Sequence, residues 1–88
     1  MKLIIAIVKD TDNDKVSHAL TSADFRVTTV ASTGGFLRRG QTTMLIGVKD
    51  ERVEEALNIL RSNVTRSTEP NVKSATIFVI KVDDFIQF

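Results

Sequence analysis

The stretch Lys2-Leu-Ile-Ile-Ala-Ile-Val-Lys9 decides the fold, because apolar and mostly β-branched residues fill both of its alternating faces. Such a strand is typical of the centre of a sheet, where other elements cover each side. The run is shorter than the ~18 residues that a membrane span needs, and no small-residue cleavage site of a signal peptide follows it. We therefore predict a central strand here and expect no membrane partner.

The next segments predict two helices on the same side of the chain's strands. Apolar residues spaced i, i+3, i+4 and i+7 indicate amphipathic helices over about residues 12–22 and 51–62. The run Asp10-Thr-Asp-Asn-Asp14 is expected to supply turn and N-cap residues before the first helix, and Asp50 to cap the second.

Alternating side chains predict three more strands, over residues 25–32, 42–49 and 75–82. The order of elements is then β-α-β-β-α-β, which is the order of a ferredoxin-like α+β sandwich. A chain of 88 residues is expected to form a single domain over residues 1–88.

This sheet has more apolar surface than two helices can cover. In the last strand, Ile77 and Val79 alternate with Phe78, Ile80 and Val82, so both faces are apolar. Because a large uncovered apolar face is rare in soluble monomers, we predict a symmetric homo-oligomer. The apolar tail, Asp83-Asp-Phe-Ile-Gln-Phe88, either belongs to the same interface or folds back over its own sheet.

Composition argues against several classes of function. The net charge is only +1, and no basic stripe of the kind that binds a nucleic-acid polymer is visible. The chain has no cysteine, which excludes thiolate metal sites and disulfides and fits a cytoplasmic setting. Its one histidine, His18, lies off the apolar stripe of its helix and is expected at the surface. We expect that the protein is not an enzyme and that it holds neither a metal ion nor a cofactor.

Two groups of acidic residues could suggest a metal site or acid–base catalysis, but the sequence supports neither function. Asp10, Asp12 and Asp14 are spaced as in a calcium loop, but the glycine and glutamate that an EF-hand needs at its sixth and twelfth positions are missing. Asp83 and Asp84 are adjacent, but nothing near them in sequence supports acid–base work. Turn and cap roles are expected for the first group.

The segment most typical of a binding loop is Thr33-Gly-Gly-Phe-Leu-Arg-Arg-Gly40, which holds three of the four glycines. Glycines allow backbone N–H groups to approach an anion, arginines pair with phosphate, and Phe36 can stack on a base. The segment lacks the Gly-Lys-Ser/Thr ending of a Walker A motif, and it precedes a strand rather than the helix of a dinucleotide fingerprint. The residues alone leave two interpretations, a ligand-binding loop or a long hairpin connection with solvated arginines.

Motifs along nearly the whole chain carry a family resemblance: Phe25-Arg-Val-Thr28, Ser32-Thr-Gly-Gly-Phe-Leu-Arg38, Gly40-Gln-Thr-Thr43, Gly47-Val48, Ala75-Thr-Ile-Phe-Val79 and Phe85-Ile-Gln-Phe88. They resemble the PII-like cyclic di-AMP receptor family, the PstA or DarA proteins of Gram-positive bacteria. The resemblance implies a PII-like homotrimer of ferredoxin-like subunits, with one ligand in each cleft between neighbours. It also implies a set of ligand-binding residues: Arg26, Thr28, Gly35, Phe36, Leu37, Gln41, Gly47, Phe78 and Gln87.

This chain departs from the family pattern at two places. Gln41 stands where the family has asparagine, so the same amide is carried on a longer arm. The connection over residues 63–74 is short, whereas the family members it resembles carry a long insertion there.

Two functions follow from the resemblance as expectations. The first is a non-enzymatic signal-transduction protein that binds the nucleotide second messenger cyclic di-AMP, which orders the glycine-rich loop and changes the surface seen by an unknown downstream protein. The alternative is a PII-like protein–protein regulator that binds another adenine nucleotide or no nucleotide.

Overall fold

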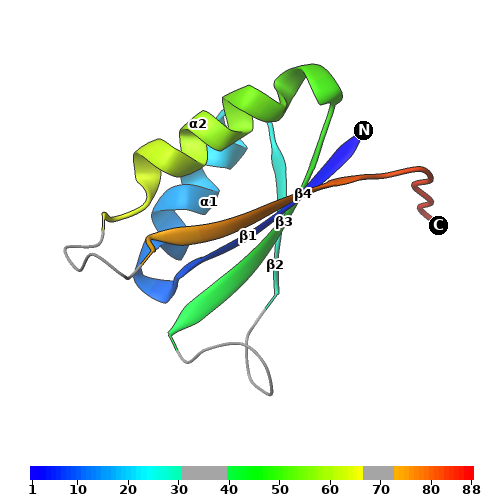
Figure 1. The fold of residues 1–88 in the computed structure, drawn as a ribbon. Coiled ribbons are helices and arrows are strands. Elements are labelled where there is room, and N and C mark those ends of the chain that lie inside the picture. Colours follow the sequence, from blue (N-terminus) through cyan, green and yellow to red (C-terminus); the bar gives the residue numbers. More distant parts are fainter. Residues whose placement is uncertain (31–39, 67–72) are drawn as a thin grey trace.

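The computed structural model describes residues 1–30, 40–66 and 73–88. Within these residues the chain forms four strands, two α-helices and two short 3-10 turns (Figure 1): β1 (Lys2–Lys9), η1 (Asp10–Asp12), α1 (Asn13–Ser22), β2 (Arg26–Val30), β3 (Gln41–Val48), η2 (Asp50–Arg52), α2 (Val53–Asn63) and β4 (Ala75–Lys81). The predicted elements are confirmed to within a few residues, and residues 31 and 32 of the predicted second strand lie outside the described residues.

The four strands form one sheet in the order β2-β3-β1-β4, in which every neighbouring pair is antiparallel. The first strand is therefore central, as its two apolar faces predicted. An antiparallel sheet of this order with two helices is the ferredoxin-like α+β fold, which confirms the predicted class. None of the helices within the described ranges is long and apolar enough to cross a membrane.

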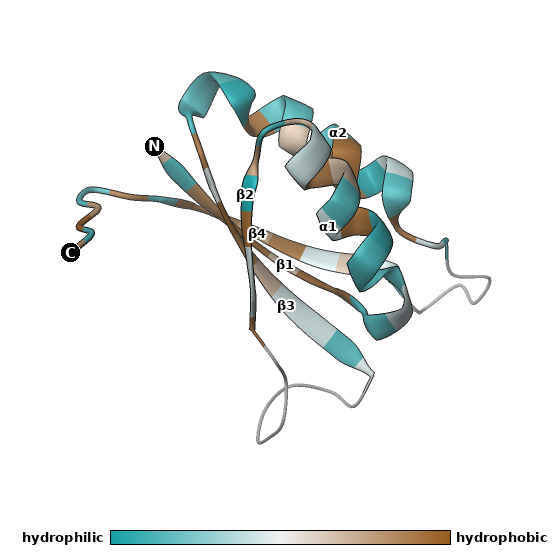
Figure 2. Ribbon diagram, turned by 180° about the vertical axis from the view of Figure 1, so that it is seen from behind, coloured by the Kyte–Doolittle hydropathy of each residue, from teal (hydrophilic) through white to brown (hydrophobic). Residues whose placement is uncertain are grey.

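Both helices lie on the same face of the sheet (Figure 1), which we call the covered face. Its strand residues alternate with those of the opposite, open face. The side chains that meet the helices are almost fully buried: Ile4, Ala6, Val8, Met44, Ile46 and Val48 from the sheet, and Val16, Leu20, Ala56 and Leu60 from the helices. Figure 2 shows the corresponding hydrophobic stripe along the helices turned toward the strands.

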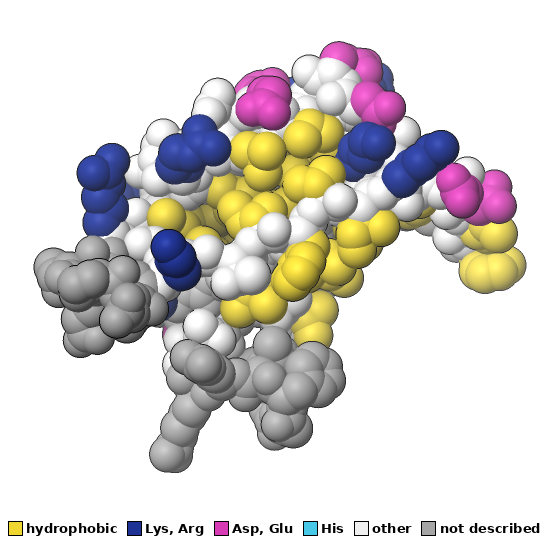
Figure 3. Space-filling model, in the orientation of Figure 1, with side chains coloured by type: hydrophobic (Ala, Val, Ile, Leu, Met, Phe, Trp, Pro, Cys, Tyr) yellow, Lys and Arg dark blue, Asp and Glu magenta, His cyan; other side chains and the backbone are white. Residues whose placement is uncertain are grey.

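The open face is lined by the other side chains of the same strands. The register places Ile5 opposite both Leu45 and Phe78, and Leu3 opposite both Gly47 and Ile80. Phe78 is 51% exposed and Ile80 is 45% exposed. Figure 3 shows hydrophobic side chains exposed along β4 and at the end of the C-terminal segment. The apolar face that the sequence predicts is therefore present and is not covered by the described residues of its own chain.

The C-terminal tail after β4 does not lie over this face. It extends away from the body of the molecule (Figure 1), and Phe85 and Ile86 are 62% and 74% exposed. Only its beginning is anchored to the sheet, where the Val82 N–H donates to the Met1 carbonyl over 3.1 Å. The structure thus differs from the alternative in which the tail covers its own sheet.

The predicted helix caps are right in part: Asp12 stands at the N-cap position of α1, whereas Asp50 begins a 3-10 turn and Arg52 is the N-cap residue of α2. A 3-10 turn separates each strand from its helix, and neither helix has a side-chain cap hydrogen bond. Asp10 instead accepts a hydrogen bond from the Thr42 hydroxyl, and Asp50 forms an ion pair with the Met1 α-amine at 2.9 Å. Asp10 and Asp50 are the first residues of these turns, and their carboxylates contact Thr42 and the Met1 amine rather than the N–H groups of the helices.

Candidate ligand site

An open cavity of about 1070 Å³ lies at the end of the sheet where β1 and β2 begin and β3 ends. We call it the tail-end pocket, because both termini lie at this end of the sheet (Figure 1) and the tail contributes to its wall. The pocket brings together four residues of the predicted ligand set: Arg26, Thr28, Gly47 and Gln87. They come from three separate parts of the chain, namely β2, β3 and the tail.

The strand register explains why three of these residues meet. Arg26 is paired with Gly47, and Thr28 is paired with Leu45, so all of them project on the open face. A Cβ atom at Gly47 would lie 3.0 Å from Cε of Met1, which is the end of a flexible side chain that is 47% exposed and can move aside. Because glycine has no side chain, residue 47 leaves room for a close approach to the backbone of β3.

Some of the charged groups that line the pocket form ion pairs, and others do not. The hydrogen-bonded ion pair with the Met1 α-amine lowers the pKa of Asp50, and the hydrogen bonds to Glu55 raise the pKa of Arg52. Arg26 forms no ion pair with any residue in the described ranges. Lys2 and Lys49 also line the pocket without an ion pair among the described residues. Of these three cations, Arg26 has the planar guanidinium that can pair with a phosphodiester through two parallel hydrogen bonds.

Two residues of the predicted ligand set, Phe78 and Gln41, lie outside the tail-end pocket. Phe78 is on the open face of β4, but it does not line the pocket. Gln41 is paired with Lys9 at the opposite end of the sheet. The rise along a strand places it ~20 Å from Gly47. Gly35, Phe36 and Leu37 lie outside the described residues.

Sequence reasoning missed several residues of the pocket. Leu3, Leu45 and Phe85 supply apolar surface, and the alternation of the strands together with the apolar tail could have suggested them. Arg52 also lines the pocket from the start of α2, and no sequence signal distinguishes it from other charged residues on the helices.

Metal binding has little support among the described residues. They include no group of three or more His, Asp or Glu side chains close enough to hold a metal ion. His18 is exposed on α1, as its place off the apolar stripe predicted. The acidic run from Asp10 to Asp14 forms a turn and the beginning of α1.

The fold is ferredoxin-like, and the tail-end pocket lies at one end of its open apolar face, with both polar and apolar side chains in its wall. The model of the cyclic-di-AMP receptor family matches residues 1–69, and the chain belongs to this family. Membership confirms the resemblance seen in the motifs and indicates a signalling protein whose ligand is a nucleotide second messenger. It implies a binding role rather than a catalytic one.

A solved structure shows the same fold over almost the whole chain. It is the crystal structure of a protein described as functionally unknown, from Pediococcus pentosaceus ATCC 25745. The two sequences are 38% identical, the TM-score is 0.81, and the match covers 99% of this chain and 96% of that chain. Because both chains are covered almost completely, they have nearly the same length.

Proposed function

We propose that this protein is a non-enzymatic receptor that binds cyclic di-AMP in the clefts between the subunits of a homotrimer. The observation that carries the proposal is the tail-end pocket, in which Arg26, Thr28, Gly47 and Gln87 converge from separate parts of the chain. Family membership supports the nucleotide ligand, and the uncovered apolar face supports the assembly.

The lining of the pocket fits the chemistry of a cyclic dinucleotide. Arg26 would pair with a phosphodiester, while the Thr28 hydroxyl and the Gln87 amide would bond to the edges of the bases. Gly47 permits the ligand to approach the backbone of β3 closely. Leu45 and Phe85 line the same pocket and offer apolar surface to the adenine rings.

The position of Gln41 supports a site built from two subunits. One chain keeps this residue at the opposite end of the sheet from Gly47. A neighbouring subunit packed on the open face could place its own Gln41 beside the pocket. We propose that the segment from Gly35 to Leu37 wraps and becomes ordered around the ligand from the same side, which would change the surface offered to a downstream protein.

A titration with cyclic di-AMP tests this proposal. We expect saturable binding by calorimetry and a ligand-dependent rise in melting temperature, because a ligand that binds only the folded state stabilises it. Cyclic di-GMP, AMP and ATP serve as comparison ligands. Arg26→Ala should weaken binding about tenfold or more, since a buried phosphate loses its charged partner.

Arg61→Ala is the matched control. Arg61 lies exposed on α2 and bonds to the neighbouring Asn58, so its loss should not change the affinity. A folded protein that binds none of the nucleotides contradicts the proposal. A response to ATP but not to cyclic di-AMP would instead support the alternative of a regulator with another adenine nucleotide.

A further inference from the structure

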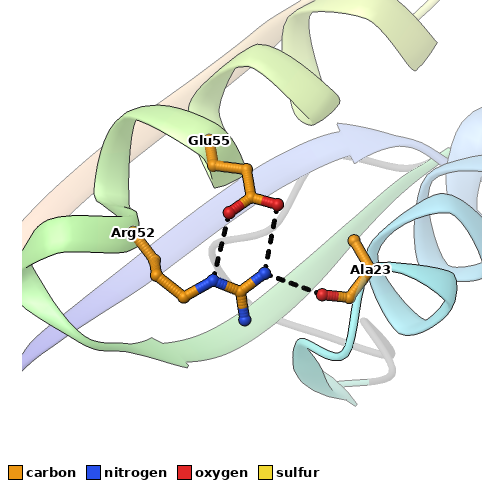
Figure 4. A network of polar contacts seen from close by, with 3 residues as sticks. All are labelled: Ala23, Arg52 and Glu55. Carbon is orange, nitrogen blue, oxygen red and sulfur yellow. Dashed lines mark hydrogen bonds and ion pairs between the residues drawn. The ribbon is translucent and has the colours of Figure 1, made fainter.

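Arg52 connects the beginning of α2 to the turn between α1 and β2 (Figure 4). Its Nε and Nη2 atoms donate to the two carboxylate oxygens of Glu55, each over 3.1 Å, and Nη2 also donates to the Ala23 carbonyl over 2.8 Å. The guanidinium carbon lies 4.0 Å from the centre of the Phe25 ring. One side chain therefore holds both the backbone and an aromatic ring of this turn.

The turn that Arg52 holds is the direct support of Arg26. After α1 the chain reverses at Asp24, which has a left-handed φ of 67°. The N–H of Asp24 donates to Thr21 over 3.0 Å, and the N–H of Phe25 donates to Leu20 over 3.0 Å, which is the hydrogen-bond pattern of a Schellman motif. Phe25 is then buried at 4% exposure, and the next residue in the chain is Arg26.

The strand that begins at Arg26 has little other support. β2 is an edge strand of five residues, it pairs only with β3, and four of its residues are exposed. Only Val27 of this strand packs against the hydrophobic core. Elements with few buried contacts open most easily, so the turn before β2 largely determines where its first residue lies.

We propose that Arg52 is a positioning residue of the ligand site, which holds the α1–β2 turn so that Arg26 presents its guanidinium to the tail-end pocket. This inference rests on the proposed function. Arg52 is a poorer direct contact for a phosphate than Arg26, because Glu55 offsets its charge and the carboxylate and Ala23 occupy two of its three nitrogen atoms. A planar guanidinium is needed for this role, since a lysine ammonium cannot lie flat on the Phe25 ring and at the same time pair with both Glu55 oxygens and the Ala23 carbonyl.

A double-mutant cycle measured by calorimetry with cyclic di-AMP tests the proposal. Arg52→Ala should weaken binding about tenfold, equivalent to about 1.4 kcal/mol. The same substitution added to Arg26→Ala should change the affinity by less than about twofold, because positioning has no effect once the positioned group is removed. Arg52→Lys should not restore the affinity, and Glu55→Gln should weaken binding by a smaller factor than Arg52→Ala.

Asp12→Ala is the control for a general loss of stability. Asp12 is buried at the other end of β1, and its partner is Thr65 rather than any pocket residue. The two variants are compared at temperatures equally far below their melting points. In the ligand-free protein, Arg52→Ala should also speed hydrogen exchange of the β2 amides, whereas Asp12→Ala should not.

The outcomes separate the two proposals. If the unaltered protein binds no cyclic di-AMP, the proposed function fails and this inference fails with it. If it binds, but Arg52→Ala binds equally well or loses the same factor in both Arg26 backgrounds, only the positioning role is overturned. Equal losses in Arg52→Ala and Asp12→Ala would also overturn it. If Arg52→Ala does not fold, Arg52→Lys and Glu55→Gln, each combined with Arg26→Ala, decide the question in the same way.

Discussion

On the covered face of the sheet, Ile4, Met44 and Ile46 are completely buried, whereas on the open face Phe78 and Ile80 are about half exposed. Both faces carry apolar side chains from the same strands, but the helices lie over the first face alone, and the open face also carries Arg26 and Thr28. The helices close the first face within one subunit, and packing there stabilises the fold. The second face adjoins the tail-end pocket, so the surface left open is also the surface nearest the proposed ligand site.

The largest effect is expected from a charge placed on the open face. Ile80→Asp should abolish the trimer, because a carboxylate buried between subunits without a partner costs several kcal/mol. Light scattering coupled to size exclusion measures the mass, which should fall from three times that of one chain. The trimer itself is part of the proposed function, so this experiment also tests that part.

Val79→Asp is the control on the same strand. Val79 and Ile80 are 44% and 45% exposed in the single chain, but the register pairs Val79 with Ile4 of the covered face. We therefore expect Val79→Asp to keep the trimer. Loss of assembly in both variants, or in neither, would contradict the assignment of the open face to the interface.

The second effect is the loss of packing on the covered face. Ile4 is fully buried under the helices, so Ile4→Ala should lower the free energy of unfolding by about 2–5 kcal/mol through lost burial and the cavity left behind. Ile86→Ala removes the same atoms from a residue that is 74% exposed in the tail, and should cost less than about 1 kcal/mol. Urea denaturation measures both, and equal losses would contradict the contrast between a covered and an open region.

A smaller effect is expected where the turn before α1 is joined to the segment that follows α2. Asp12 is 3% exposed, and it accepts hydrogen bonds from the N–H and the hydroxyl of Thr65 over 3.0 and 2.6 Å. Asp12→Ala should cost about 1–3 kcal/mol at neutral pH, because the Thr65 N–H and hydroxyl lose their acceptors.

This effect should depend on pH in a defined direction. Burial alone raises the pKa of Asp12, but the hydrogen bonds from Thr65 and the nearby Lys9 and Lys15 lower that pKa overall. A carboxyl with a lowered pKa stabilises the folded state above its ordinary pKa, and this contribution is lost as the pH falls. The difference between the unaltered protein and Asp12→Ala should therefore shrink below about pH 4. A constant difference between pH 7 and pH 3 would contradict the charged role of Asp12.

Much of the fold could be predicted because it depends on local periodicity. The apolar residues on both faces of β1 placed it at the centre, and the apolar spacing around Val16 and Leu60 gave both helices and the faces that they bury. The caps could not be predicted in the same way. Asp10 and Asp12 bond to Thr42 and Thr65, residues distant in sequence, and only the folded arrangement brings those partners near.

The site was predictable only in part, for a similar reason. The motifs identified Arg26 and Gly47, and the strand register brings these two together. Nothing in the pattern of residues indicated Arg52, because the positioning role that we propose for it depends on a ring and a carbonyl that precede β2. Gln41 was predicted as part of the same site, yet one subunit places it at the far end of the sheet. A list of residues from one chain cannot say which of them belong to a neighbour.

The smallest effect on stability is expected from two adjacent threonines of β3, which lie on opposite faces of the sheet. The Thr42 hydroxyl, on the covered face, donates to Asp10, whereas the Thr43 hydroxyl, on the open face, is buried without a hydrogen-bond partner among the described residues. Thr42→Val should cost about 1 kcal/mol in urea denaturation. Thr43→Val should be neutral or stabilise by up to about 1 kcal/mol, because the new methyl group replaces an unpaired hydroxyl of the same size. If Thr43→Val instead destabilises the assembled protein as much as Thr42→Val does, the Thr43 hydroxyl has a partner on a neighbouring subunit. The interface on the open face would then be polar at this end of the sheet and apolar around Phe78 and Ile80.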